Sequence, residues 1–288
     1  MACYHYRIVN VFAESTFGGN PLCVFEDARG MTDATMQALA LQFNLSETTF
    51  LLPSDAADAK VRIFTPGFEM RFAGHPTLGS AHVMRSLMET GDALKLEFKA
   101  GVVPVTALGD VWTFTAPAPV DPPMRAAGIT RDLIARMIGL TEDDLQGDPM
   151  WVDTGTEQLL IRVKDMETVR RASPDGALFA QWPLSGQDRK MAYVFAFGAG
   201  GGERTEVAAR FFYAKHGDSF SEDPGTGSAC ANLGGWLIGT GHALPCSFQI
   251  NQGEAVGRPC RLLLDVTAQR AIQVSGRVIA LGRGSVDI

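Results

Sequence analysis

The chain has 288 residues, of which 46% are hydrophobic and 20% charged, and this composition predicts a sizeable core and excludes a globally disordered chain. A net charge of −7, without any lysine- and arginine-rich run, argues against nucleic acid and anionic membranes as partners. The sequence starts without a signal-peptide pattern and has no apolar run of membrane-spanning length, so we expect a cytoplasmic protein.

The first half of the sequence predicts strands around one central helix. Thr32 can cap a short helix that ends near Asn44. Pro76 suits the first turn of a second helix, which should run to about Gly91. The expected strands alternate apolar and polar residues or lie between turn residues, and they cover 4–12, 21–25, 48–52, 61–65, 68–72, 94–98, 102–107 and 111–115.

A proline-rich stretch, A-P-A-P-V-D-P-P at 116–123, then interrupts the pattern and predicts a linker between two lobes. The second half repeats the arrangement, with a helix from about Pro224 to Gly239 and strands at 191–197, 207–214, 248–251, 262–266 and 272–281. We therefore expect one lobe at 1–118, a second at 119–270, and a terminal strand at 271–288 that could return to the first lobe.

Two segments of the chain look like copies of one another. F-A-G-H-P-T-L-G-S-A begins at Phe72, and S-E-D-P-G-T-G-S-A begins at Ser221. A shift of 148 positions places His75 on Asp223 and aligns the prolines that follow them. Each lobe should then direct a helix N-terminus, with its unpaired amide groups, at a shared cleft that attracts an anion.

Three side chains near these motifs can carry proton chemistry. Glu47 follows a helix end and precedes an apolar strand; it is either an ordinary loop carboxylate or a cleft acid whose pKa burial would raise. His75 and Asp223 are either helix N-caps or assisting groups, one able to exchange a proton and the other able to fix it. Gly74, Gly227 and Ser228 would supply donors for a carboxylate.

Metal and disulfide chemistry are disfavoured by the sequence. The five cysteines are odd in number and lack C-x-x-C spacing, and the histidines show no ligand-like clustering. We expect no metal ion.

The motifs together resemble the PhzF family of phenazine-biosynthesis isomerases. V-N-V-F-A-E-S-T-F-G-G-N-P-L-C-V-F, S-E-T-T-F-L, the two repeated segments and G-E-A-V-G-R-P occur in order and span nearly the whole chain. The resemblance implies an α+β, diaminopimelate-epimerase-like fold with two pseudo-symmetric lobes, each a mixed barrel-like sheet around a central helix, and a homodimer without organic cofactor or metal.

The resemblance also implies a reaction and a set of site residues. The substrate would be a small, cyclic or amine-bearing carboxylate such as trans-2,3-dihydro-3-hydroxyanthranilate, isomerised by moving a proton. Glu47 would be the general acid and base, with His75 and Asp223 assisting. Substrate contacts map to Asn20, Ser46, Gly74, Gly227 and Ser228.

Two alternatives stay open. The same scaffold occurs in amino-acid racemases and epimerases with two facing cysteines, but neither helix motif here contains a cysteine at its start, and Cys230 lies beyond it. A catalytically idle ligand-binding or interaction protein is the other alternative. The joint presence of Glu47, His75 and Asp223 argues against it, because binding alone would not need all three.

Overall fold

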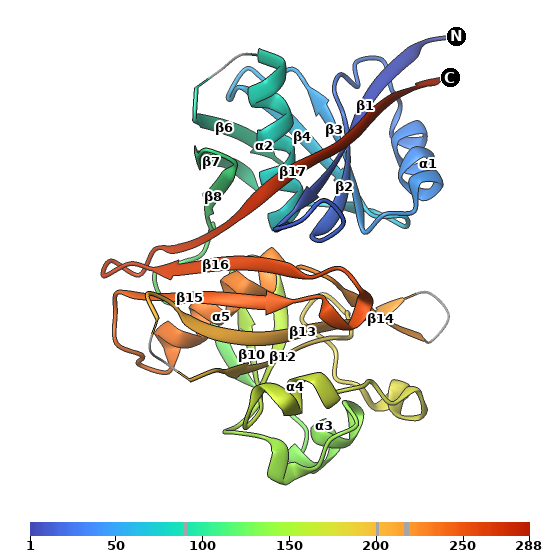
Figure 1. The fold of residues 1–288 in the computed structure, drawn as a ribbon. Coiled ribbons are helices and arrows are strands. Elements are labelled where there is room, and N and C mark those ends of the chain that lie inside the picture. The colour runs from blue at the N-terminus through green and yellow to red at the C-terminus, as the bar shows by residue number, and fades with distance from the viewer. Residues whose placement is uncertain (89–90, 200–201, 216–218) are drawn as a thin grey trace. The chain divides into compact units, whose positions relative to one another are not determined.

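A computed structural model describes residues 1–88, 91–199, 202–215 and 219–288. The chain divides into two compact units, one formed by residues 1–115 and 274–288 and the other by residues 116–273 (Figure 1). The proline-rich stretch therefore begins the second unit. The last residues of the chain belong to the first unit.

The first unit consists of strands that surround the helix α2, together with a second helix, α1. Its elements are β1 (Cys3–Val11), β2 (Asn20–Phe25), α1 (Asp33–Phe43), β3 (Glu47–Leu52), β4 (Ala59–Phe64), β5 (Glu69–Met70), α2 (Gly74–Met88), β6 (Ala93–Phe98), β7 (Gly101–Leu108), β8 (Val111–Thr115) and β17 (Ile272–Asp287). The strand expected at 68–72 is shorter than predicted, because the chain leaves the sheet after Met70 to enter α2.

Eight strands of the described first unit close into a mixed barrel. The hydrogen-bonded order is β17-β1-β2-β3-β4-β6-β7-β8, and β8 pairs again with β17. The pairs β2–β3 and β4–β6 are parallel, with α1 and α2 as their respective connections, and the other pairs within the ring for which a register is given are antiparallel. The long β17 runs beside β1, so both chain ends lie together, joined by hydrogen bonds between Ala2 and Ile288.

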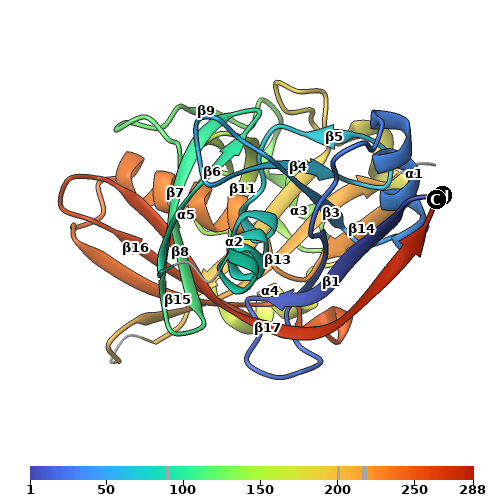
Figure 2. The same cartoon turned by 90° about the horizontal axis from the view of Figure 1, so that it is seen from above.

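Helix α2 fills this barrel. It contacts seven of the eight strands, from β1 round to β8, and Figure 2 views it with these strands around it. Gly79 allows the close approach, since a Cβ there would lie 2.5 Å from Leu22 Cδ2 on β2. Every residue from Gly74 to Ala81 is buried, as expected for a helix enclosed by a sheet.

Helix α1 covers the outside of the barrel. Thr32 caps it as predicted, accepting a hydrogen bond from the Thr35 amide, and Asn44 ends it in the left-handed conformation at φ 52°. Its apolar residues pack on a ladder of three rings from β2, β3 and β4, in which Phe25 stacks on Phe50 at 4.9 Å and Phe50 meets Phe64 edge-on at 5.5 Å.

The second unit has the same order of elements with additional helices at its start. It contains β9 (Met124–Ala126), α3 (Arg131–Met137), η1 (Glu142–Asp144), β10 (Met150–Asp153), β11 (Glu157–Arg162), α4 (Met166–Arg171), η2 (Gly176–Gln181), β12 (Met191–Phe197), β13 (Thr205–Lys215), β14 (Ser219–Asp223), α5 (Gly227–Gly239), β15 (Cys246–Gln252), η3 (Glu254–Val256) and β16 (Cys260–Val266). Sequence patterns did not predict β10, β11 or α4.

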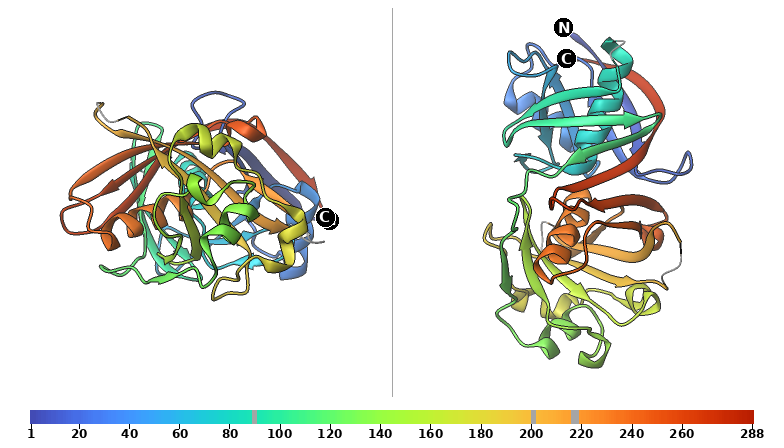
Figure 3. Two further views of the ribbon diagram at one scale, coloured as in Figure 1. Left: turned by 90° about the horizontal axis from the view of Figure 1, so that it is seen from below. Right: turned by 90° about the vertical axis from the view of Figure 1, so that its left-hand side faces the viewer.

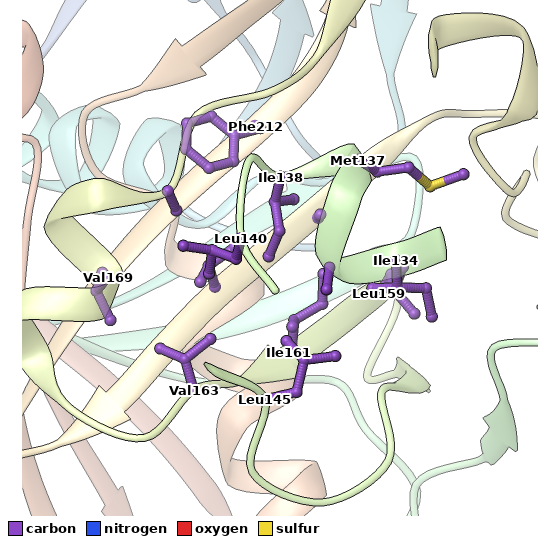
Figure 4. Packing of buried hydrophobic residues seen from close by; sticks show 14 of the residues in the cluster. Ile134, Met137, Ile138, Leu140, Leu145, Leu159, Ile161, Val163, Val169 and Phe212 are labelled. Carbon is purple, nitrogen blue, oxygen red and sulfur yellow. The ribbon is translucent and has the colours of Figure 1, made fainter. Parts of the chain in front are cut away.

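Two hydrophobic layers enclose the sheet of the second unit. On one side α5 packs against β10, β11 and β16, seen in orange in Figure 3, and a Cβ at Gly234 would lie 2.7 Å from Ile272 Cγ2. A second cluster gathers residues of α3, α4 and β11, among them Ile134, Val169 and Ile161 (Figure 4). Each unit is therefore a mixed sheet around a central helix, which confirms the expected architecture.

The strand pairing corrects the alignment of the two repeated segments. Phe64 pairs with Glu69 and Phe212 with Glu222, so the shift of 148 holds for the strands β4 and β13. The second hairpin is five residues longer, and the helices and the strands after them, from Gly74 to Gly227 and from Ala93 to Cys246, are displaced by 153 positions instead. By this register the counterpart of His75 is Ser228 and not Asp223.

Candidate active site

Glu47 lies at the junction between α1 and β3. The left-handed turn at Asn44 ends the helix, and Glu47 begins the strand three residues later. In the parallel pair β2–β3, Glu47 lies opposite Leu22, whose side chain faces α2. Glu47 therefore belongs to the end of the barrel at which α2 starts, and its side chain is 15% exposed.

His75 contacts Glu47 at this barrel end. The distance from His75 Nε2 to Glu47 Oε2 is 3.3 Å, and the imidazole is 5% exposed. On its other side, His75 Nδ1 lies 3.4 Å from Asn20 Nδ2 at the start of β2. Three of the residues proposed from the sequence, Asn20, Glu47 and His75, thus come together although 55 positions separate the outer two.

Burial keeps His75 neutral. It lowers the pKa of the imidazole to about 3, so the ring carries no charge near pH 7. With Asn20 Nδ2 as the donor, Nδ1 is the acceptor, and the ring hydrogen resides on Nε2, the nitrogen that faces the carboxyl of Glu47. His75 can therefore donate a hydrogen bond to a carboxylate at Glu47, but it is not a proton donor in the imidazolium form at neutral pH.

His75 is not a helix cap, contrary to one of the interpretations of the sequence. Helix α2 begins at Gly74, so His75 already lies in its first turn, and Pro76 follows inside that turn. Gly74 is buried, and Ser46 is the residue that directly precedes Glu47. The helix start, the imidazole and the carboxyl group thus share one end of the first unit.

Asp223 is the last residue of β14 and does not cap α5. The helix begins four residues later, at Gly227, with Thr226 as its N-cap residue, so Pro224 lies before the helix. The Asp223 carboxylate accepts a hydrogen bond of 2.5 Å from the Thr226 hydroxyl, and Gln252 donates both to the Asp223 carbonyl and to Thr226 Oγ1. The five extra residues of the hairpin displace the helix relative to the motif, which explains the wrong expectation for Pro224.

Ser228 lies in the first turn of α5 and is held by buried amides. Gln158 Nε2 on β11 donates to Ser228 Oγ at 3.0 Å, and Asn232 Nδ2, one helical turn further along α5, donates to Gln158 Oε1 at 2.8 Å. Gln158 and Asn232 are almost completely buried. Gly227, the first residue of the helix, is buried beside them.

Sequence reasoning missed Gln158, Asn232, Thr226 and Gln252. Asn232 had the clearest signal, because it is a polar residue in the otherwise apolar run A-C-A-N-L-G-G of a central helix. Gln158 and Gln252 gave no such signal, since their hydrogen-bond partners are distant in sequence.

Two of the cysteines, Cys23 and Cys230, lie where thiol chemistry is disfavoured. Cys230 is the fourth residue of α5 and Cys23 lies within β2, and both are fully buried. Burial raises the pKa of each thiol far above its ordinary value. Among residues 74–77 and 223–228, which form the two helix starts, there is no cysteine, so the pair of facing thiolates that a two-thiol racemase requires is missing here.

In the described part of the chain, no three His, Cys, Asp or Glu side chains gather closely enough to hold a metal ion. Nor is any described helix both long and apolar enough to cross a bilayer.

Comparison with known proteins gives a consistent result. The model of the phenazine biosynthesis-like protein family PhzC-PhzF matches residues 9–284. The chain is 37% identical to an uncharacterized isomerase of Pasteurella multocida over 99% of this chain and 94% of the relative. It is 30% identical to the trans-2,3-dihydro-3-hydroxyanthranilate isomerase of Pseudomonas aeruginosa over 98% of both chains. The crystal structure of a Bacillus anthracis phenazine biosynthesis protein, PhzF family, superimposes with a TM-score of 0.86 at 23% identity over the full length of both chains.

These neighbours confirm the expected fold class, α+β with the diaminopimelate-epimerase-like architecture. The structure groups the candidate residues into two sets. Asn20, Glu47 and His75 form the set of the first unit, while Asp223, Gly227 and Ser228 form the set of the second.

Proposed function

The chain belongs to the PhzC-PhzF family of phenazine biosynthesis-like proteins, and several of its relatives are named isomerases; from this premise we propose that it moves a proton on a small carboxylate without a cofactor. The substrate we propose is a cyclic, amine-bearing acid such as trans-2,3-dihydro-3-hydroxyanthranilate, which the name of the Pseudomonas aeruginosa relative specifies for that protein.

The contact between Glu47 and His75 carries this proposal. A carboxyl group, mostly shielded from water, lies 3.3 Å from an imidazole that burial keeps neutral. A carboxyl group that accepts and returns a proton needs a partner that can donate a hydrogen bond to its charged form without competing for the proton. Neutral His75, oriented by Asn20, has these properties.

The reaction follows from these roles. The Glu47 carboxylate removes the hydrogen on C3 of the substrate as a proton, and the electron pair of that bond moves into the conjugated system. The protonated Glu47 then delivers a proton to C1, and the product tautomerises to a ketone. One carboxyl group serves both steps, so atoms and charge balance without an oxidant, a metal or a second base.

We assign substrate binding to the second set of residues. The amide groups at the start of α5 and the Ser228 hydroxyl would hold the substrate carboxylate, and Asp223 would hold its amine. We further propose a homodimer, for which light scattering should give the mass of two 30.9 kDa chains.

Proton exchange tests the proposed function directly. The protein is incubated in D₂O with trans-2,3-dihydro-3-hydroxyanthranilate, and mass spectrometry follows deuterium in the carbon-bound positions of the product. We expect isomerisation with deuterium uptake from the wild type and neither from Glu47→Gln. Saturable binding of the acid without exchange or product would refute the proposal and favour a binding protein on the same scaffold.

A further inference from the structure

The start of α5 is not closed by its own cap residue. Thr226 occupies the N-cap position, but its side chain makes no hydrogen bond to the first-turn amides. Its hydroxyl instead donates to Asp223 Oδ2 at 2.5 Å and accepts from Gln252 Nε2 at 3.0 Å. A capping hydroxyl normally satisfies one of the unpaired N–H groups of the first turn. In α5 the Thr226 hydroxyl is directed at Asp223 and Gln252 and does not accept from a first-turn amide.

The orientation of Asn232 is fixed by the backbone. Its Oδ1 accepts a hydrogen bond of 2.8 Å from the amide of Thr154, and its Nδ2 donates over 2.8 Å to the carbonyl of Thr156. A backbone amide can only donate and a backbone carbonyl can only accept. The oxygen and nitrogen of the Asn232 side chain are therefore determined by its partners.

This orientation is passed on to Gln158 and Ser228. Because Asn232 Nδ2 donates to Gln158, the atom that it meets must be the oxygen Oε1, and the nitrogen Nε2 then faces Ser228. Ser228 Oγ consequently accepts from Gln158. A hydroxyl group that is held as an acceptor on one side still has its hydrogen to donate on another.

We propose that Gln158 and Asn232 are positioning residues that make Ser228 a hydrogen-bond donor toward the substrate, so that the start of α5 selects an acceptor group, a carboxylate, over an ammonium group. The inference rests on the proposed function, whose carboxylate site it describes. The first-turn amides and the Ser228 hydroxyl together offer donors, while Thr226 Oγ1 is directed at Asp223 Oδ2 and Gln252 Nε2 and not at the first turn. Gln158 and Asn232 thus determine whether the site prefers an acceptor or a donor group on the ligand, although neither residue needs to contact the substrate.

Replacing Gln158 by Glu exchanges the donor Nε2, which faces Ser228, for an acceptor oxygen, so only one heavy atom of the side chain changes. The new carboxylate still accepts from Asn232 Nδ2, but it also presents an acceptor to Ser228 and takes up the hydroxyl hydrogen. Calorimetry with anthranilate, a stable aromatic amino acid, and with aniline, which lacks the carboxylate, measures the effect without turnover. We expect Gln158→Glu to weaken anthranilate binding by about 10- to 100-fold, the range of one hydrogen bond to a charged group, and to leave aniline binding nearly unchanged.

A double-mutant cycle separates the effect of reversing the hydrogen bond between Ser228 and residue 158 from the effect of the added negative charge. In a Ser228→Ala background no hydroxyl remains to be turned, so Gln158→Glu should cause a much smaller further loss, which measures the charge alone. Gln158→Met removes the link without a charge and should weaken anthranilate binding only a few-fold. Gln249→Glu, the same exchange at a partly buried position of β15, serves as the control for folding and charge.

The outcomes distinguish this inference from the proposed function. Equal losses from Gln158→Glu with and without Ser228, or equal losses for anthranilate and aniline, would overturn the positioning role while leaving the isomerase proposal intact. A wild-type protein that binds anthranilate no better than aniline would refute carboxylate recognition itself, and the inference would fall with it.

Discussion

The starts of helices α2 and α5 occupy equivalent places in the two units but carry different chemistry. At α2, His75 meets the Glu47 carboxyl at 3.3 Å, and a single amide, from Asn20, supports the ring. At α5, the equivalent residue is Ser228, and a chain of two buried amides anchored on the backbone supports it. The first arrangement contains a group that can exchange a proton, whereas the amides and hydroxyl of the second cannot titrate near neutral pH.

The same strand order therefore supports two tasks that a proton-transfer enzyme must separate. A proton carrier has to change its charge during the cycle, and a substrate clamp has to keep its polarity while this happens. The contacts at the two helix starts define this difference.

The largest expected effect comes from removing the proposed proton carrier. Glu47→Gln keeps the size of the side chain and most of its hydrogen bonding, so the protein should fold and bind substrate while kcat falls by about 10²–10⁴-fold or more. Steady-state kinetics and circular dichroism check both parts. Glu97→Gln, a partly exposed carboxylate of the same unit paired with Ser54 and Lys60, is the matched control and should keep wild-type turnover. A Glu47→Gln enzyme of nearly normal kcat would show that another group carries the proton.

The second effect belongs to the other helix start. Ser228→Ala removes one donor to a charged group, which corresponds to about 10- to 100-fold in binding. Because the clamp holds the substrate and the transition state alike, KM should rise by about this factor while kcat changes little. The reverse result, a large fall in kcat at constant KM, would break the division of tasks between the two units.

A third, structural effect tests how tightly each helix is enclosed. Gly79→Ala brings a Cβ within 2.5 Å of Leu22, and Gly234→Ala brings one within 2.7 Å of Ile272. Both should lower the free energy of unfolding by about 1–3 kcal/mol, measured by urea denaturation. Gly176→Ala is the control, since its Cβ would meet nothing within 4 Å and its stability should stay within about 0.5 kcal/mol of the wild type.

The last effect is a pH dependence of stability specific to the first helix start. The pKa of His75 falls from an ordinary value of about 6.5 to about 3 in the folded protein, so between these values the unfolded chain binds a proton that the folded chain does not. This contribution is complete above pH 6.5 and is lost, at up to about 1.4 kcal/mol per pH unit, as the pH falls toward 3.

His75→Gln removes this contribution. Between pH 6 and 4, the free energy of unfolding of the variant should therefore decline less steeply than that of the wild type, whereas above pH 7.5 the two slopes should agree. Parallel curves over the whole pH range would mean that His75 has the same pKa in the folded and unfolded states. That result would contradict the neutral imidazole on which the proposed mechanism depends.

The sequence by itself determined the elements that depend on local patterns. The Thr32 cap, the helix end at Asn44, the alternating strands of the first unit and the strand at 191–197 follow from capping groups and periodicity, which act over a few residues. The proline-rich stretch at 116–123 and the motifs around Glu47, His75 and Asp223 were equally readable as patterns, while the role of the stretch as a linker and the catalytic roles of these residues stay predictions. The region from 139 to 190 was not, because the buried run of β11 lacks alternation and α4 is only six residues long.

Only the tertiary structure decided which residues meet. Pairing of β13 with β14 shows that five extra residues displace the second helix, so Ser228 and not Asp223 corresponds to His75. It also shows that Asn20 supports His75 and that Gln158 and Asn232 support Ser228. These contacts join residues 55 to 74 positions apart, and no local pattern encodes them, because they depend on strand register and on the seating of each helix within its sheet.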